Sequence, residues 1–181
     1  MQLFNRATLH GMHPTRTLGP DHPQTLTSMD NLSTCLVYMR RYDEAEDLTT
    51  AMLERARRVL GPDHPNTQTA LNTLATIYFA QRRLEDAEPI LAEVAATIRR
   101  TRGPDDWMLG TVLSNHGLCL LKLKREAEAE AALLEAYQIL STSLGPTHGR
   151  AITVVGLLID LYEGRRNDEQ VAAWKARRPA D

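Results

Sequence analysis

The chain has 181 residues, 21 basic and 23 acidic side chains, and a formal net charge of −2 at pH 7. This balance excludes the broad positive surface that binds nucleic acid or anionic lipid, and 5% aromatic residues leave little surface for stacking on bases. No apolar run approaches the roughly 18 residues of a membrane span. The first ten residues lack the basic start and apolar core of a signal peptide. We therefore expect a cytoplasmic protein with no nucleic-acid or membrane partner.

A Gly-Pro pair recurs at a constant interval along the chain. The motif LGPDHPQT begins at Leu18, and LGPDHPNT begins 42 residues later at Leu60. The same interval leads to further pairs, so that four glycines stand in phase: Gly19, Gly61, Gly103 and Gly145. A repeat of this kind divides the chain into one supersecondary unit per interval. The predicted segments are a lead segment 1–18, three units at 19–60, 61–102 and 103–144, and a last unit at 145–181.

Each unit contains two stretches whose apolar residues are spaced by three and four, as on one side of a helix. In the first unit, the first stretch carries Leu26, Met29, Leu32, Cys35, Leu36 and Met39, and the second carries Ala45, Leu48, Met52, Leu53 and Ala56. Later units repeat both patterns, and no lasting period-two alternation indicates a strand. A helix pair of this length cannot bury its apolar side alone. The prediction is an all-α protein, an α-solenoid of about 3.5 to 4 stacked antiparallel helix pairs.

The ends of the predicted helices have local causes. The Gly-Pro pair ends each second helix, because glycine supplies a left-handed C-terminal position and proline cannot continue the helix. Asp21 and Asp63 are candidate N-caps of the first helices, and Pro23 and Pro65 suit a first helical turn.

One helix pair resembles the tetratricopeptide repeat: Leu74, Ala75 and Tyr78, followed by Ala87 and Leu91, match the pattern Leu-small-x-x-Tyr and Ala-x-x-x-large. The 42-residue unit and the LGPDHP linker resemble the kinesin-light-chain variety. The closing segment is similar to the end of arrays linked to bacterial Ser/Thr protein kinases. The resemblance implies a bacterial signalling context, although the chain itself holds no kinase motif.

The two ends of the chain carry separate expectations. Residues 1–18 align with a second helix that has no first helix before it, and Gly11 and Pro14 should weaken that helix. The segment is either part of a longer array or a degenerate cap. At the other end, Lys175 and Arg178 replace apolar positions, as a terminal repeat with a polar outer face requires.

Residues that could carry chemistry favour structural roles. His22, His64 and His148 share one repeat position beside the Gly-Pro turn, too far apart to bind one metal ion, and we expect turn or cap roles for them. His116 is expected to be a core histidine with a bonded nitrogen. Cys35 and Cys119 are expected to be buried, reduced thiols. The acidic pairs Glu44/Glu46 and Glu126/Glu128 are expected to be helix-start charges. The prediction is therefore no enzyme, no metal and no cofactor.

The resemblance implies that the first helices line a concave groove that binds extended peptides. Kinesin-light-chain repeats place an asparagine three residues before the small position, because a carboxamide can both donate to and accept from a peptide backbone. Only Asn72 matches this residue; the other units carry Asp30, Ser114 and Gly156 there. The groove candidates are Thr27, Asp30, Thr34, Tyr38, Thr69, Asn72, Thr76, Phe79, Ser114 and Leu118.

Two functions follow from these observations. The first is a protein-interaction module that binds a peptide or a partner domain in the groove. The second is an assembly segment without a peptide ligand, which self-associates into a homodimer through its open N-terminal edge.

Overall fold

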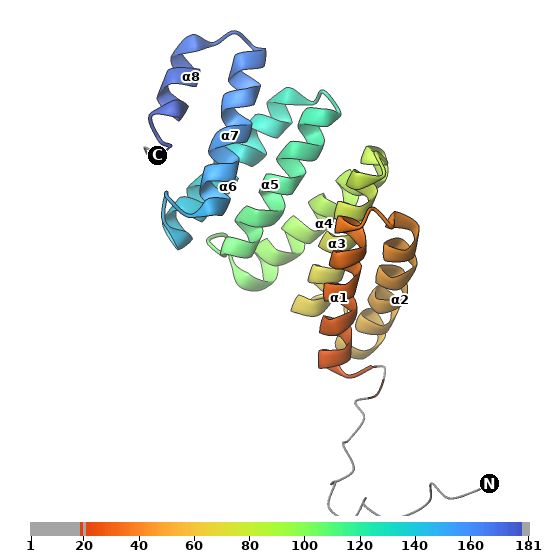
Figure 1. The fold of residues 1–181 in the computed structure, drawn as a ribbon. Coiled ribbons are helices and arrows are strands. Elements are labelled where there is room, and N and C mark those ends of the chain that lie inside the picture. The colour runs from red at the N-terminus through yellow and green to blue at the C-terminus, as the bar shows by residue number, and fades with distance from the viewer. Residues whose placement is uncertain (1–18, 20, 179–181) are drawn as a thin grey trace, which may run out of the picture.

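The computed structural model describes residue 19 and residues 21–178, and the lead segment 1–18 lies outside this part. The described residues form eight helices and no strand, which confirms the predicted all-α class (Figure 1). The helices are α1 (Pro23–Tyr38), α2 (Tyr42–Leu60), α3 (Pro65–Ala80), α4 (Leu84–Arg102), α5 (Trp107–Lys122), α6 (Glu126–Leu144), α7 (Gly149–Gly164) and α8 (Asp168–Lys175). None of the described helices combines the length and the apolar character needed to cross a membrane.

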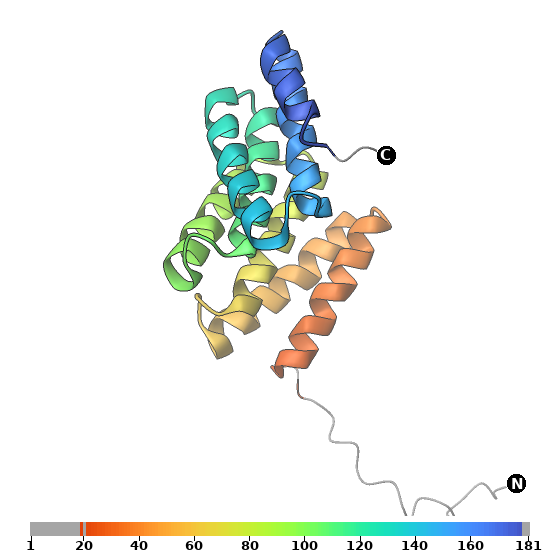
Figure 2. The same ribbon diagram turned by 90° about the vertical axis from the view of Figure 1, so that its left-hand side faces the viewer.

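Successive helices pack side by side as antiparallel pairs, and the pairs stack into one elongated array (Figures 1 and 2). Each second helix also contacts the first helix of the following pair, so α2 packs on α3, α4 on α5 and α6 on α7. Among the first helices, α1 contacts α3 and α5 contacts α7, whereas α3 and α5 stand further apart. We call the side of the array formed by α1, α3, α5 and α7 the first-helix face.

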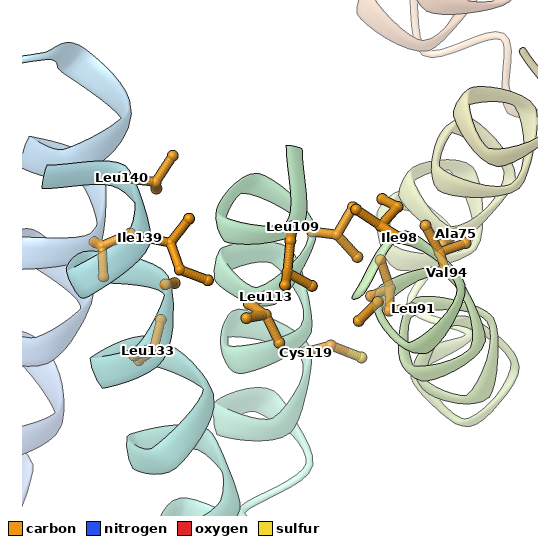
Figure 3. Packing of buried hydrophobic residues seen from close by; sticks show 14 of the residues in the cluster. Ala75, Leu91, Val94, Ile98, Leu109, Leu113, Cys119, Leu133, Ile139 and Leu140 are labelled. Atoms are coloured by element: carbon orange, nitrogen blue, oxygen red, sulfur yellow. The ribbon is translucent and has the colours of Figure 1, made fainter. Parts of the chain in front are cut away.

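One large hydrophobic cluster runs through the stack from Leu26 in α1 to Trp174 in α8, and two small clusters lie beside it. Figure 3 shows its central part, where Ile98 of α4 lies toward Leu109 and Leu113 of α5, and Leu133 of α6 lies on the other side of α5. Each helix pair therefore completes its core only through its neighbours. In such a repeat array, stability is approximately a sum of terms within and between adjacent units.

Histidine side chains cap the N-termini of three of the described first helices. His22, His64 and His148 cap α1, α3 and α7, and their Nδ1 atoms accept the backbone N–H two residues later at 3.1, 3.1 and 3.2 Å. The predicted cap role of these histidines is confirmed.

The prediction that Asp21 and Asp63 are N-caps is wrong. Because proline occupies the first helical position, the residue directly before it becomes the cap, and in the PDHP sequence that residue is histidine. The two aspartates instead bind Arg58 and Arg100, at 3.0 and 2.7 Å. In the third unit Asp106 takes over the cap of α5.

Two kinds of positive-φ residue separate the helices. Gly61, Gly103 and Gly145 end the second helices with φ of 86°, 98° and 95°. Their ψ values are extended, a conformation that is essentially restricted to glycine and lies outside the left-handed helical region expected from the sequence. The left-handed position itself is held by residues after the first helices: Arg40, Arg82, Lys124 and Arg166. There the N–H of Arg41 reaches back to the carbonyl of Leu36 at 2.9 Å, which closes the first helix tightly.

The predicted buried stripe of the first unit is only partly buried. Leu26 and Leu36 lie in the core, whereas Leu32 is 53% exposed, Met39 is 64% exposed and Cys35 is exposed. The expectation that Cys35 is buried is therefore wrong, although Cys119 is buried. The reason is position in the stack: the corresponding positions of later units face the preceding second helix, and no described helix precedes α1.

Close packing of α5 on α6 depends on two glycines, Gly110 and Gly117. A Cβ added at Gly117 would lie 2.6 Å from Cγ of Leu133, and one at Gly110 would lie 2.8 Å from Cγ of Leu140. Overpacking costs about 1–3 kcal/mol, more than the roughly 1 kcal/mol of helix propensity that alanine gains over glycine. We expect Gly117→Ala to lower the free energy of unfolding by about 1 kcal/mol in urea titrations.

Gly156 in α7 is the matched control, because nothing lies within 4 Å of a Cβ added there. Gly156→Ala should raise the free energy of unfolding by about 0.5–1 kcal/mol. Equal stabilisation by both substitutions would contradict the close α5–α6 contact.

Candidate peptide-binding groove

Polar side chains bridge neighbouring first helices on the first-helix face. The hydroxyl of Thr73 in α3 donates to Asp30 of α1 at 2.8 Å. One unit further on, the amide of Asn115 in α5 donates to the carbonyl oxygen of Asn72 in α3 at 3.3 Å. The same contact cannot form between α5 and α7, because Leu157 stands at the position of Thr73 and Asn115. The asparagine expected from the resemblance, Asn72, is thus half-buried and paired across the α3–α5 gap.

A hollow of about 150 Å³ opens beside this asparagine pair, where α3 and α5 diverge. Its lining combines the predicted residues Thr76, Phe79 and Leu118 with Asn115, Ala75 and Leu91. Pockets for small molecules usually measure roughly 300–1,000 Å³. The hollow therefore has room for one side chain of a partner and is too small for a cofactor.

Phe79 also borders a second, wider recess of about 390 Å³ toward the C-terminal ends of α3 and α5. Arg82 and Lys122 line this recess together with Ala80 and Leu84. Among the described residues, neither basic side chain forms an ion pair with a carboxylate. One end of the groove therefore carries positive charge that the sequence analysis did not assign to it.

The other predicted groove residues are distributed along α1, α3 and α5. The hydroxyls of Thr27, Thr69 and Thr76 donate to carbonyls four residues earlier in their own helices, at 3.0, 3.0 and 2.9 Å. In the first unit, Thr34 is exposed and Tyr38 is 85% exposed. Ser114 is buried, so it lies below the surface that the others share. The structure brings Thr76, Phe79 and Leu118 together around the hollow, and Asn72 is joined to it through its bond with Asn115. Thr27, Asp30, Thr34 and Tyr38 belong to the first unit.

The core histidine has the bonded nitrogen that was expected. His116 Nε2 lies 3.0 Å from Oε1 of Glu88 in the preceding α4. Burial, together with the charges of Glu88 and Glu85, raises the pKa of the Cys119 thiol to about 11, so at neutral pH this thiol stays protonated.

Glu44 stands in the first turn of α2, Glu46 lies two residues further on, and Glu126 and Glu128 stand in the first turn of α6; all four bind arginines. Hydrogen bonds from Arg41 and Arg125 lower the pKa values of Glu44 and Glu128. Both carboxylates are charged at neutral pH, the opposite of what a general acid requires. Within residues 21–178, no group of three His, Cys, Asp or Glu side chains is arranged to hold a metal ion.

Two segments, residues 39–100 and residues 66–142, match the model of the tetratricopeptide repeat, and together they cover more than half of the chain. The chain belongs to the tetratricopeptide repeat family. Repeats of this family are in general protein-interaction scaffolds that bind proteins or peptides, and they are typically not enzymes. No curated protein matches the chain.

Solved structures show the same fold. BtubC (BKLC) of P. vanneervenii has a TM-score of 0.76 and 18% identity, over 85% of this chain and 61% of that protein. A putative kinesin light chain of Podosopora anserina with nearly identical TPR-like repeats has a TM-score of 0.77 and 18% identity, over 84% of this chain and 72% of that one. The tetratricopeptide array described here thus spans about three fifths of BtubC, and the likeness concerns the fold.

Asn115 and the two basic residues are the parts of the groove that the sequence analysis missed. The family resemblance pointed to the repeat position of Asn72, whereas Asn115 belongs to the next position, which holds Asn31, Thr73 and Asn115 in successive units. This second polar column was a signal that could have located Asn115. For Arg82 and Lys122 the sequence offered no such signal, because both lie among other basic residues at helix ends.

Asp30 occupies the repeat position of Asn72, and burial raises the pKa of its carboxyl, against the opposing effect of the Thr73 hydrogen bond. The folded state therefore holds this proton more tightly than the unfolded state. The resulting stabilisation is complete below the unfolded pKa of about 3.9 and is lost as pH rises through the raised folded value. Asp30→Asn should make the array more stable than wild type at pH 7, with a smaller difference at pH 4.

Urea titrations at the two pH values measure this effect. Asp47→Asn, at an exposed position of α2, is the control and should show no such change between the two pH values. A gain from Asp30→Asn that is equal at pH 4 and pH 7 would contradict the role of the buried charge.

Proposed function

We propose that this array is a protein-interaction scaffold that binds an extended peptide segment of a partner along the first-helix face. The observation that carries the proposal is the hollow between α3 and α5, where apolar walls from Phe79 and Leu118 stand beside the carboxamides of Asn72 and Asn115. Extended peptides are recognised in this way when main-chain hydrogen bonds supply affinity and a pocket for a side chain supplies specificity.

The asparagine pair retains hydrogen-bonding capacity for a ligand. A carboxamide has two donors and two acceptor lone pairs. The bond at 3.3 Å uses one donor of Asn115 and one acceptor site of Asn72. The amide of Asn72 and the carbonyl of Asn115 remain to donate to and accept from a peptide backbone that crosses the gap. One apolar side chain of that peptide would enter the hollow.

The basic end of the groove favours an acidic neighbour on the same peptide. Arg82 and Lys122 line the recess that adjoins Phe79. A carboxylate placed there would sit within reach of two cations, which adds affinity at low salt and steers association. The proposed ligand is therefore an extended segment with an apolar residue close to an acidic one.

We place this scaffold in the cytoplasm, as part of a larger bacterial signalling protein. The support for this context is the similarity of the closing segment to the ends of kinase-linked arrays. In that setting, the partner is another protein or another domain of the same protein.

The test is a selection of phage-displayed random peptides on the full chain, followed by titration of a selected peptide. We expect Leu118→Asp and Phe79→Ala each to weaken binding by tenfold or more, which is about 1.4 kcal/mol. Leu134→Asp is the control, because it makes the same substitution at an exposed leucine of α6, away from the hollow, whereas Leu118 is half-buried at its border. It should change the affinity by less than twofold, with unchanged circular dichroism in all variants.

The selected peptides should also be enriched in acidic residues, and Lys122→Glu should weaken their binding. Equal affinity for wild type, Leu118→Asp and Phe79→Ala would show that the peptides bind elsewhere and would overturn the proposal.

A further inference from the structure

A polar residue, Gln68, lies in the core near the N-terminal end of α3, where it is only 4% exposed. At intervals of 42 residues the same repeat position holds Leu26, Gly110 and Ile152, none of which has a polar side chain. Leu26 is 1% exposed, so the position belongs to the apolar core. A glutamine there requires hydrogen-bond partners, because a buried polar group without them costs free energy.

The carboxamide of Gln68 is only partly satisfied. Its Nε2 atom donates to the carbonyl oxygen of Pro62 at 2.6 Å. Its Oε1 atom is buried and accepts no hydrogen bond from any described residue. The group that completes this amide must therefore bring an N–H or O–H donor.

Gln68 lines a recess of about 180 Å³ between the N-terminal ends of α3 and α5 and the C-terminal end of α4. The apolar walls of this recess are Pro65, Ile98 and Met108, and Figure 3 shows Ile98 on the side of α4 that faces α5. We call this space the Gln68 recess. Its volume is close to that of the hollow beside the asparagine pair, and it far exceeds the roughly 10–15 Å³ that admits one water molecule. One side chain of a partner therefore fits into it.

The two charged residues that line the Gln68 recess, Asp63 and Arg102, are both paired. The carboxylate oxygens of Asp63 accept from Arg100 at 3.0 and 2.7 Å, and Nε of Arg102 donates to Asp106 at 2.7 Å. An uncharged occupant suits this surrounding. Arginine carries five donors, so Arg102 retains N–H groups that a ligand oxygen can accept from.

A carboxamide complements these groups better than a hydroxyl does. Gln68 and Arg102 belong to different helices, α3 and α4. A carboxamide donates through its nitrogen and accepts through its oxygen, so two separate atoms can serve the two residues, whereas a hydroxyl has one oxygen for both. The methylene groups behind a carboxamide can pack on the apolar walls.

Three openings lie in a row along the gap between α3 and α5: the Gln68 recess, the hollow beside the asparagine pair, and the wider recess lined by Arg82 and Lys122, which we call the basic recess. In that order, the lining residues from α3 include Gln68, Thr76 and Ala80, and those from α5 include Met108, Leu118 and Lys122. Antiparallel α4 contacts both helices and lines the openings in the reverse order, with Ile98, Leu91 and Leu84. An extended segment that follows the gap therefore passes all three.

We propose that the Gln68 recess is a third anchor site of the peptide groove, which takes an asparagine or glutamine side chain of the bound segment. The inference rests on the proposed function and adds a residue class and an order to it. Gln68 and Thr76 are about 12 Å apart along α3, and an extended chain covers about 3.3 Å per residue. The carboxamide residue therefore lies about four positions from the apolar residue in the hollow, and the acidic residue lies on the other side of that apolar residue.

Peptides selected on the full chain test this order. We expect them to carry a carboxamide residue about three to five positions from the apolar residue, on the side away from the acidic one. A second selection on Gln68→Leu should keep the apolar and acidic positions and lose the enrichment in carboxamides. Leu26 shows that this repeat position accommodates a leucine, so the melting temperature of Gln68→Leu should not fall below that of wild type.

A double-mutant cycle measures the contact itself. One selected peptide and its analogue, in which leucine replaces the carboxamide residue, are titrated on wild type and on Gln68→Leu. The analogue should bind wild type about fivefold more weakly, because a buried acceptor then stays unpaired. On Gln68→Leu the two peptides should bind within about twofold of each other. Gln138→Leu, the same substitution at an exposed residue of α6, is the matched control and should behave as wild type.

Failure of this inference and failure of the proposed function give different results. If Leu118→Asp leaves binding unchanged, the peptides do not use the groove, and both proposals are overturned. If binding depends on Leu118 but the selected peptides lack the carboxamide, or the cycle shows no coupling to Gln68, the groove stands and the third anchor site is overturned. In that case water alone completes the Gln68 amide.

Discussion

The structure depends on one constraint: a two-helix unit of this length cannot bury its apolar side chains without a neighbour. Helix α4 packs against α5 as well as α3, and its buried residues include Ala87, Leu91, Val94 and Ile98. The resulting core is continuous from Leu26 to Trp174. Repetition at a constant 42-residue interval satisfies the constraint, since each unit then presents the same surface to the next. The Gly-Pro turns keep the interval constant by ending each second helix in a conformation that glycine adopts readily.

Ion pairs between neighbouring units supplement this apolar packing. Arg83 binds Glu46 of the preceding unit at 2.9 Å, and Arg125 binds Glu88 at 3.3 Å. In the next unit Glu130 takes the same repeat position and binds Arg165. Surface ion pairs of this kind contribute only about 0–1 kcal/mol each. The glutamates of these pairs occupy the same repeat position near the start of α2, α4 and α6. The pairs therefore contribute more to the register between neighbouring units than to the free energy of unfolding.

The candidate site and the open edge are both departures from perfect repetition. Gly110 and Gly117 let α5 approach α6 closely, and on the other side α5 stands away from α3. Phe79 and Leu118 border the resulting space without closing it. At the N-terminal end, α1 has the uncharged composition of an interior first helix but no described neighbour on one side, so Leu32, Cys35 and Met39 are exposed. The candidate groove and the exposed side of α1 thus both lie where an inter-helix contact is incomplete.

The amino-acid sequence by itself determined the helix pairs, their 42-residue spacing and the all-α stack, because periodic apolar residues and Gly-Pro turns act over short distances. It also placed Asn72, Thr76, Phe79 and Leu118 on one side of the first helices. It could not determine which residues take the caps, since Asp21 and His22 compete for that position and the proline at position 23 decides it. The tertiary structure alone decided that Asn115 meets Asn72 and that Cys35 is exposed whereas Cys119 is buried. Such outcomes depend on the distance between neighbouring units and on whether a neighbour exists, and no residue carries that information within its own repeat.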